Sequence, residues 1–198
     1  MQRTLPPEAE HLFPLGAPSI VTTRLRPQEP DEWSDEVREI LGDASLNILR
    51  TIAHHAPLLK PFLGFTATLA LRGSLPRRES ELLALRAAWN CRSPFEWGHH
   101  VLYARAEGLS DEMILRVAHE PEHASWSERD RLLLSAADEL HRDQQLHDST
   151  WGALRAEFDD AQLVEIPFVV GNYTMLSMVA NATGVPLEPG LPELPNAG

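Results

Sequence analysis

Cysteine is nearly absent from this chain of 198 residues, and its scarcity excludes one class of chemistry. Cys91 is the single cysteine, so one chain can neither form an internal disulfide nor run a dithiol cycle on its own. A lone thiol suits a reducing compartment, and the first residues hold no apolar run long enough for a signal peptide. We therefore expect a cytoplasmic protein with an inert Cys91.

Basic residues are also scarce. The chain has 17 lysines and arginines against 29 aspartates and glutamates, which gives a net charge of -12. Nucleic acids and anionic membranes both require a basic face, so we expect neither of them as a partner. A small anionic substrate remains compatible with this charge if arginines gather in one place.

The chain lacks an uninterrupted apolar run of the length that a membrane span needs. Its longest apolar stretch, residues 163–180, is interrupted by Glu165, Pro167, Gly171 and Asn172. This composition predicts a buried core helix rather than a span.

Strand patterns are missing too, because no segment alternates apolar and polar residues convincingly. Apolar residues recur at helical spacing instead, for example at Leu58, Phe62, Phe65 and Leu69. Prolines cluster at both ends of the chain. We predict an extended arm over residues 1–30, one all-α domain of about eight or nine helices over 31–184, and an extended tail over 185–198.

Residues 81–108 read as two helices joined by a tight break near residues 91–93. Ser93 is a favourable N-cap, Pro94 suits the first helical position, and Glu96 could close a capping box back to Ser93. Gly108 is expected to end the second helix in a left-handed conformation.

A cluster of titratable side chains lies around this break. Glu96, His99 and His100 stand at i, i+3 and i+4 and share one side of the second helix. Glu81 joins them if the two helices pack antiparallel. A carboxylate and an imidazole one turn apart can share a proton, which suits general acid–base catalysis. The structural alternative is that Glu96 only caps its helix and Glu81 only pairs with Arg77 or Arg78.

A metal site finds less support. Glu96 and His99 form a Glu-x-x-His motif, but a second instance, Glu120 to His123, contains a proline where a helix should be ending. We therefore predict no metal. Trp97 and Tyr173 either line a pocket or pack in the core.

The segment from Leu75 to Gly108, LPRRESELLALRAAWNCRSPFEWGHHVLYARAEG, resembles the carboxymuconolactone decarboxylase family, which includes the alkyl hydroperoxidase D proteins. The likeness extends over roughly residues 35–188. In the peroxidase branch a glutamate precedes a Cys-x-x-Cys and a histidine. Here Glu81 and His100 match that glutamate and histidine, while Ser93 and Glu96 occupy the two cysteine positions. The resemblance therefore implies an alkyl hydroperoxidase D-like fold without peroxidase activity.

The cysteine-free branch of this family includes cofactor-independent lactone decarboxylases. The resemblance implies a small anionic lactone or keto acid as substrate and a homo-oligomer, either trimer or hexamer. It assigns proton donation to His100, assisted by Glu81 or Glu96. The candidate substrate-binding residues are Arg77, Arg86, Trp97, His99 and Tyr173. Isomerisation, lactone hydrolysis, cyclisation and a non-catalytic ligand-binding oligomer remain the alternatives.

Overall fold

The computed structural model describes residues 22–43 and 46–196, and within them it contains helices and no strands. The all-α prediction is thus confirmed. In chain order the elements are the 3₁₀ turn η1 (Pro30–Glu32), α1 (Asp35–Leu41), α2 (Asn47–Ile52), the 3₁₀ turn η2 (Ala53–His55), α3 (Ala56–Arg72), α4 (Arg77–Asn90), α5 (Pro94–Ala106), α6 (Asp111–His119), α7 (Glu128–Asp143), α8 (Asp148–Glu157) and α9 (Asp160–Thr183).

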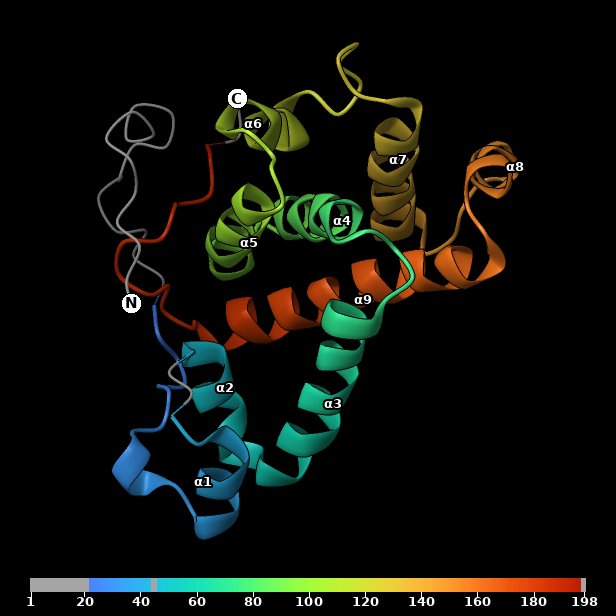
Figure 1. Ribbon diagram of the computed structural model, residues 1–198. Helices are drawn as coiled ribbons and strands as arrows, with labels where there is room; N and C mark the ends of the chain where they lie inside the picture. The colour runs from blue at the N-terminus through green and yellow to red at the C-terminus, as the bar shows by residue number, and fades with distance from the viewer. Residues whose placement is uncertain (1–21, 44–45, 197–198) are drawn as a thin grey trace.

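Helix α4 occupies the centre of the fold (Figure 1). It contacts α5, α6, α7 and α9, and residues 79–89 are all buried. A helix that is covered all round belongs to a core, yet this one carries the ionisable residues Glu79, Glu81 and Arg86 in its buried part. Each of these charges must therefore find a partner inside the protein.

Ion pairs to α7 satisfy two of these three buried residues. The pairs that join α4 to α7 are Glu79–Arg129, Arg78–Asp130 and Arg86–Asp138. Arg86 also donates to the carbonyl oxygens of residues 117 and 118 at the end of α6. These contacts orient α4 about its own axis and leave Glu81 facing α5.

Helix α9 runs beneath α4 along most of the molecule (Figure 1). By length and composition it could cross a membrane, but 56% of its most apolar window is buried inside the fold. The predicted core helix also has an exposed apolar stripe, formed by Val164, Phe168, Met175 and Met178.

Helix α3 differs from the predicted register. The apolar spacing placed Leu58 on the buried side, but Leu58 is 53% exposed whereas Leu59 is fully buried. Phe62 and Leu69 are partly buried, as expected. The prediction was wrong at Leu58 because α3 packs against α1 and α2 near its start and against α9 further along, so its buried residues do not form one stripe.

The described ends of the chain lie against the helices. The amides of Arg24 and Leu25 donate to the carbonyl of Thr183, at 2.8 and 3.0 Å. Residues 185–196 form no helix or strand, as predicted, and pass close to α5 at Gly98. The first 21 residues of the predicted arm lie outside the described part of the chain.

Two glycines with left-handed backbones provide a matched test of packing at the end of α9. Gly184 (φ +69°) and Gly108 (φ +86°) both incur strain of about 1–2 kcal/mol when replaced by alanine. A Cβ at Gly184 would also overlap the Thr22 carbonyl, whereas one at Gly108 meets nothing within 4 Å. Urea denaturation should therefore show a larger loss of stability for Gly184→Ala than for Gly108→Ala. Equal losses would contradict the close contact between Thr22 and the end of α9.

Candidate active site

The break between α4 and α5 is closed by a Schellman motif. The amide of Ser93 donates to the Ala88 carbonyl at 2.9 Å, and the amide of Arg92 donates to the Trp89 carbonyl at 3.0 Å. Arg92 adopts the left-handed backbone (φ 51°) that usually selects glycine, and its guanidinium lies 4.2 Å from the centre of the Trp89 ring. This stacking offsets part of the backbone strain.

The Schellman motif determines whether Glu96 can take part in a capping box. Ser93 accepts from the Glu96 amide through its hydroxyl, so the predicted N-cap is confirmed. The Ser93 amide, however, already donates to Ala88. The Glu96 side chain therefore does not close the predicted capping box, and that half of the prediction was wrong. Its carboxyl group is buried at the pocket wall instead.

Glu81 and His100 meet where α4 packs against α5. His100 Nδ1 lies 2.6 Å from Glu81 Oε2, and the other carboxylate oxygen lies 2.6 Å from Arg77 Nη2. Glu81 is 1% exposed and His100 is 3% exposed. A carboxyl group this deeply buried needs such partners, and by accepting the Nδ1–H it orients the imidazole.

The second imidazole nitrogen faces Glu96. His100 Nε2 lies 3.7 Å from Glu96 Oε2, and within the described residues Glu96 Oε1 has no hydrogen-bond partner. Burial raises the pKa of the Glu96 carboxyl, and the neighbouring histidines only partly oppose this rise. Glu96 therefore retains a proton more readily than an ordinary glutamate does. At 3.7 Å the two groups are too far apart for a direct hydrogen bond, and one water between them would complete a path for proton exchange.

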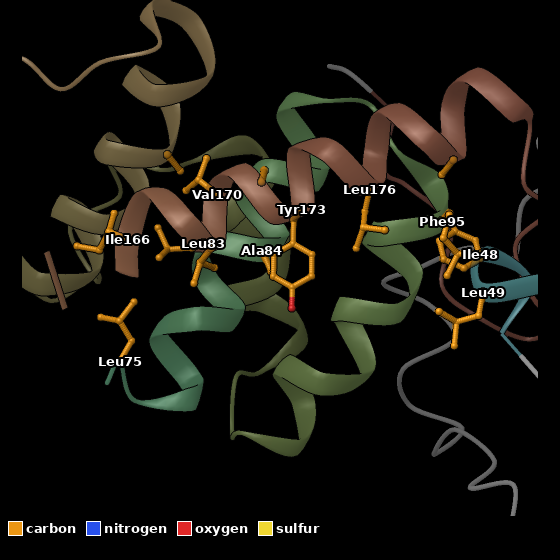
Figure 2. Close-up of a cluster of buried hydrophobic side chains, with 14 of the residues drawn as sticks. Ile48, Leu49, Leu75, Leu83, Ala84, Phe95, Ile166, Val170, Tyr173 and Leu176 are labelled. Atoms are coloured by element: carbon orange, nitrogen blue, oxygen red, sulfur yellow. The ribbon is translucent and has the colours of Figure 1, made fainter. Parts of the chain in front are cut away.

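A pocket of about 220 Å³ opens onto Glu96 and His100, whereas Glu81 is not part of its wall. It lies among α2, α3, α5 and α9, and its wall includes Arg77, Glu96, His99 and His100. Most of the remaining wall is apolar; Figure 2 shows four of these wall residues, Ile48, Leu49, Phe95 and Leu176, together with Tyr173.

Two tyrosines enclose the His100 ring edge to face. The ring centroids of Tyr103 and Tyr173 lie 5.5 and 4.1 Å from that of His100. Burial, reinforced by the nearby Glu81, raises the pKa of both phenols. Both tyrosines therefore remain neutral and restrict how far the imidazole can turn. Tyr103 was missed from the sequence because its helical position alone does not separate a pocket wall from a solvated flank.

His99 lines the pocket beside His100 but pairs with the C-terminal tail. Its Nε2 lies 2.7 Å from Glu188 Oε2, and Glu188 Oε1 accepts from the Asn47 amide, also at 2.7 Å. Burial acts to raise the pKa of Glu188, but these hydrogen bonds outweigh it and lower that pKa. Gly98 permits the close approach, because a Cβ there would lie 2.9 Å from the Pro192 carbonyl oxygen. No local pattern marks Glu188 in the sequence.

Two predicted substrate-binding residues lie away from the pocket. Arg86 is held by Asp138 and by the end of α6, and Trp97 is fully buried in a second apolar cluster beside Trp89. Cys91 also lies outside the pocket wall, and burial raises the pKa of its thiol. Arg77, His99 and Tyr173 are the predicted substrate-binding residues that the structure brings to the pocket.

Metal-binding geometry is not found among the side chains of residues 22–43 and 46–196. No group of three or more histidines, cysteines, aspartates or glutamates there is arranged to hold an ion.

The segment that carries this site matches the profile of the carboxymuconolactone decarboxylase family over residues 56–139. The resemblance to this family is therefore confirmed over residues 56–139, which make up less than half of the chain. The match covers α3 to most of α7, and so it includes Glu81, Glu96 and His100. No curated protein matches the chain.

Solved structures share the fold of this chain at low identity. An uncharacterised peroxidase-related protein from Ralstonia eutropha, described as an alkylhydroperoxidase AhpD core, has a TM-score of 0.75 and 18% identity, covering 86% of this chain and 98% of that one. A peroxidase-related protein from Silicibacter has a TM-score of 0.68 and 21% identity, covering 96% of each chain. The debrominase Bmp8, bound to 2,3,4-tribromopyrrole, has a TM-score of 0.71 and 14% identity, covering 85% and 94%. The alkyl hydroperoxidase D-like fold is therefore confirmed.

The opposite pKa shifts of Glu96 and Glu188 predict opposite pH dependences of stability. The folded protein holds the Glu96 proton more tightly than the unfolded chain does, so ionising Glu96 costs stability as pH rises above the ordinary carboxyl range. Glu96→Gln should therefore gain stability relative to wild type as pH rises. The lowered pKa of Glu188 adds stability above that range and loses it as pH falls, so Glu188→Gln should be less stable near neutrality and approach wild type in acid.

Urea denaturation of both variants between about pH 3 and pH 8, across the range where carboxyl groups titrate, measures these differences. Stability differences that do not change with pH would contradict the assigned shifts.

Proposed function

We propose that this chain is a proton-transfer enzyme of the decarboxylase type, with His100 as the group that delivers the proton. One observation carries the proposal: side chains from α4 and α5 converge at the wall of one pocket, with His100 held between Glu81 and Glu96. A buried carboxyl group with a raised pKa beside a histidine at a pocket wall is typical of functional sites.

Each residue has a distinct part in the proposed reaction. The substrate loses carbon dioxide, and the bonding electrons remain on carbon as a delocalised enolate-like anion. His100 protonates that carbon from Nε2, and Glu96, 3.7 Å away, restores the proton through one bridging water. Glu81 accepts the Nδ1–H and stabilises the imidazolium, while Arg77 offers its remaining N–H donors to the departing carboxylate.

The apolar wall supports this chemistry. A carboxylate bound among apolar side chains loses most of its hydration, whereas the charge of the product anion is spread over several atoms. Isomerisation is the nearest alternative, because it would use the same groups to remove a proton from one carbon and return it to another. A peroxidase is not proposed, because Ser93 caps α5 and Glu96 takes the position of the second cysteine.

His100→Ala tests the catalytic proposal directly. With an unsaturated γ-lactone acid as probe, we expect kcat to fall by about 10²–10⁴-fold, the usual contribution of a positioned general acid. Carbon dioxide release measures turnover, and circular dichroism checks folding. Cys91→Ser should keep full activity because its thiol lies outside the pocket wall. A folded His100→Ala variant with full turnover would overturn the assignment, and an unfolded one would favour a structural role.

We further propose that the exposed stripe of α9 packs against a second copy of the chain. Four large apolar side chains on one side of a helix form the kind of patch that marks an interface. The stripe is also self-complementary: two antiparallel copies centred on Gly171 would place Val164 against Met178 and Phe168 against Met175.

Phe168→Glu should therefore lower the molecular mass of the assembly in light scattering. Trp151→Glu is the matched control, because Trp151 is a 41% exposed aromatic residue on α8, outside the stripe. If both variants keep the mass of the wild type, this interface is wrong.

A further inference from the structure

The charged side chains around the pocket limit the net charge of the substrate, which the reaction type alone does not. Arg77 is the one arginine or lysine on the pocket wall, counted over the described residues, and it already pairs with Glu81. Three carboxyl groups lie around the site, belonging to Glu81, Glu96 and Glu188. The pocket therefore cannot balance several negative charges on a ligand.

The ion pairs around the pocket determine how many negative charges a ligand can carry there. His99 and Glu188 form a pair of their own at the edge of the pocket. Burial raises the pKa of the Glu96 carboxyl, so this group retains a proton more readily than an ordinary glutamate and opposes a bound anion less. With a proton on His100, the positive charges of Arg77 and His100 exceed that of Glu81 by one. One carboxylate on the ligand would balance this excess. A second would lie in an apolar site without a cation, which is costly.

The free donors of Arg77 locate that carboxylate. A guanidinium has five N–H groups, and here one contacts Glu81 and another weakly contacts the Ala70 carbonyl at 3.4 Å. The side chain is 29% exposed at the pocket wall, so the remaining donors can reach a ligand.

The rest of the wall selects the body of the ligand. Leu46, Ile48, Leu49, Phe95 and Leu176 supply apolar contact surface, and Thr66, Tyr103 and Tyr173 add hydroxyl groups but no charge. The volume of about 220 Å³ lies below the range of pockets that hold drug-sized ligands. A small ring or short branched chain would fill it.

We propose that the substrate is a small monocarboxylate with an apolar body, bound with its single carboxylate at Arg77 and its reacting carbon at His100. This inference rests on the proposed function for the position of the reacting carbon. It goes beyond that function by excluding di-acids and uncharged molecules as the preferred ligands.

Three probes of similar shape test the charge: phenylacetate, the neutral phenylacetamide, and the di-acid 2-carboxyphenylacetate. Isothermal titration calorimetry on the full-length protein should find phenylacetate the tightest of the three. Hydrogen bonds between charged groups imply a preference of roughly tenfold or more over the amide. Tighter binding of the di-acid or of the amide, or equal binding of all three, would overturn the proposal.

Variants of two adjacent arginines locate the carboxylate. Arg77→Gln should remove the preference for phenylacetate over phenylacetamide, and Arg77→Lys, which keeps the charge near Glu81, should retain part of it. Arg78→Gln removes the same charge from the next residue, which pairs with Asp130 outside the pocket, and should leave the preference intact. A preference that survives in a folded Arg77→Gln variant, or is lost in Arg78→Gln, would overturn the assigned position. These binding measurements do not depend on turnover. They can therefore contradict the proposed ligand class while the His100→Ala result supports the proposed reaction, or support the ligand class while that result contradicts the reaction.

Discussion

The buried carboxylate of Glu81 is the constraint around which the site is built. Helix α4 is covered by four other helices, so an ionised side chain at its centre must be matched inside the protein. Arg77 and His100 provide that match, one from the same helix and one from α5. Because Glu81 Oε2 holds His100 Nδ1, the imidazole lies in one orientation, with its second nitrogen toward Glu96. Glu81 thus serves both the packing of α4 and the orientation of the imidazole proposed to transfer the proton.

The burial of α4 also explains why one of its arginines faces the pocket while the others form ion pairs within the fold. Arg78 and Arg86 are both held by aspartates of α7, and Arg86 also bonds to the end of α6. These contacts set the rotation of α4, and only Arg77 is left facing the pocket. Packing between α4 and α7 therefore determines which cation a ligand can meet. The net charge of the chain is strongly negative, so this local selection matters more than the overall composition.

Much of the fold follows from local sequence. Ser34, Ser110, Ser127 and Asp159 each accept from a backbone amide at the helix starts where their residue types predict a cap. The convergence of Glu81 and His100 also followed from helical spacing together with the family resemblance. Other features depend on tertiary contacts that no local pattern records: Leu58 is exposed because α3 changes partners along its length. The choice of Arg77 over Arg86, and the pairing of His99 with a tail residue almost ninety positions away, depend on burial and long-range packing.

The break at residues 91–93 also limits how this chain can vary in length. Short surface loops usually tolerate insertions and deletions. Here Ser93 serves both helices at once, since its amide closes α4 on Ala88 while its hydroxyl caps α5 on Glu96. One added residue would separate these two bonds and change the orientation of α5 relative to α4. His100 would then no longer face Glu81. The length of this connection is therefore expected to be invariant among chains that keep the site, although loops between helices usually vary in length with little loss of stability.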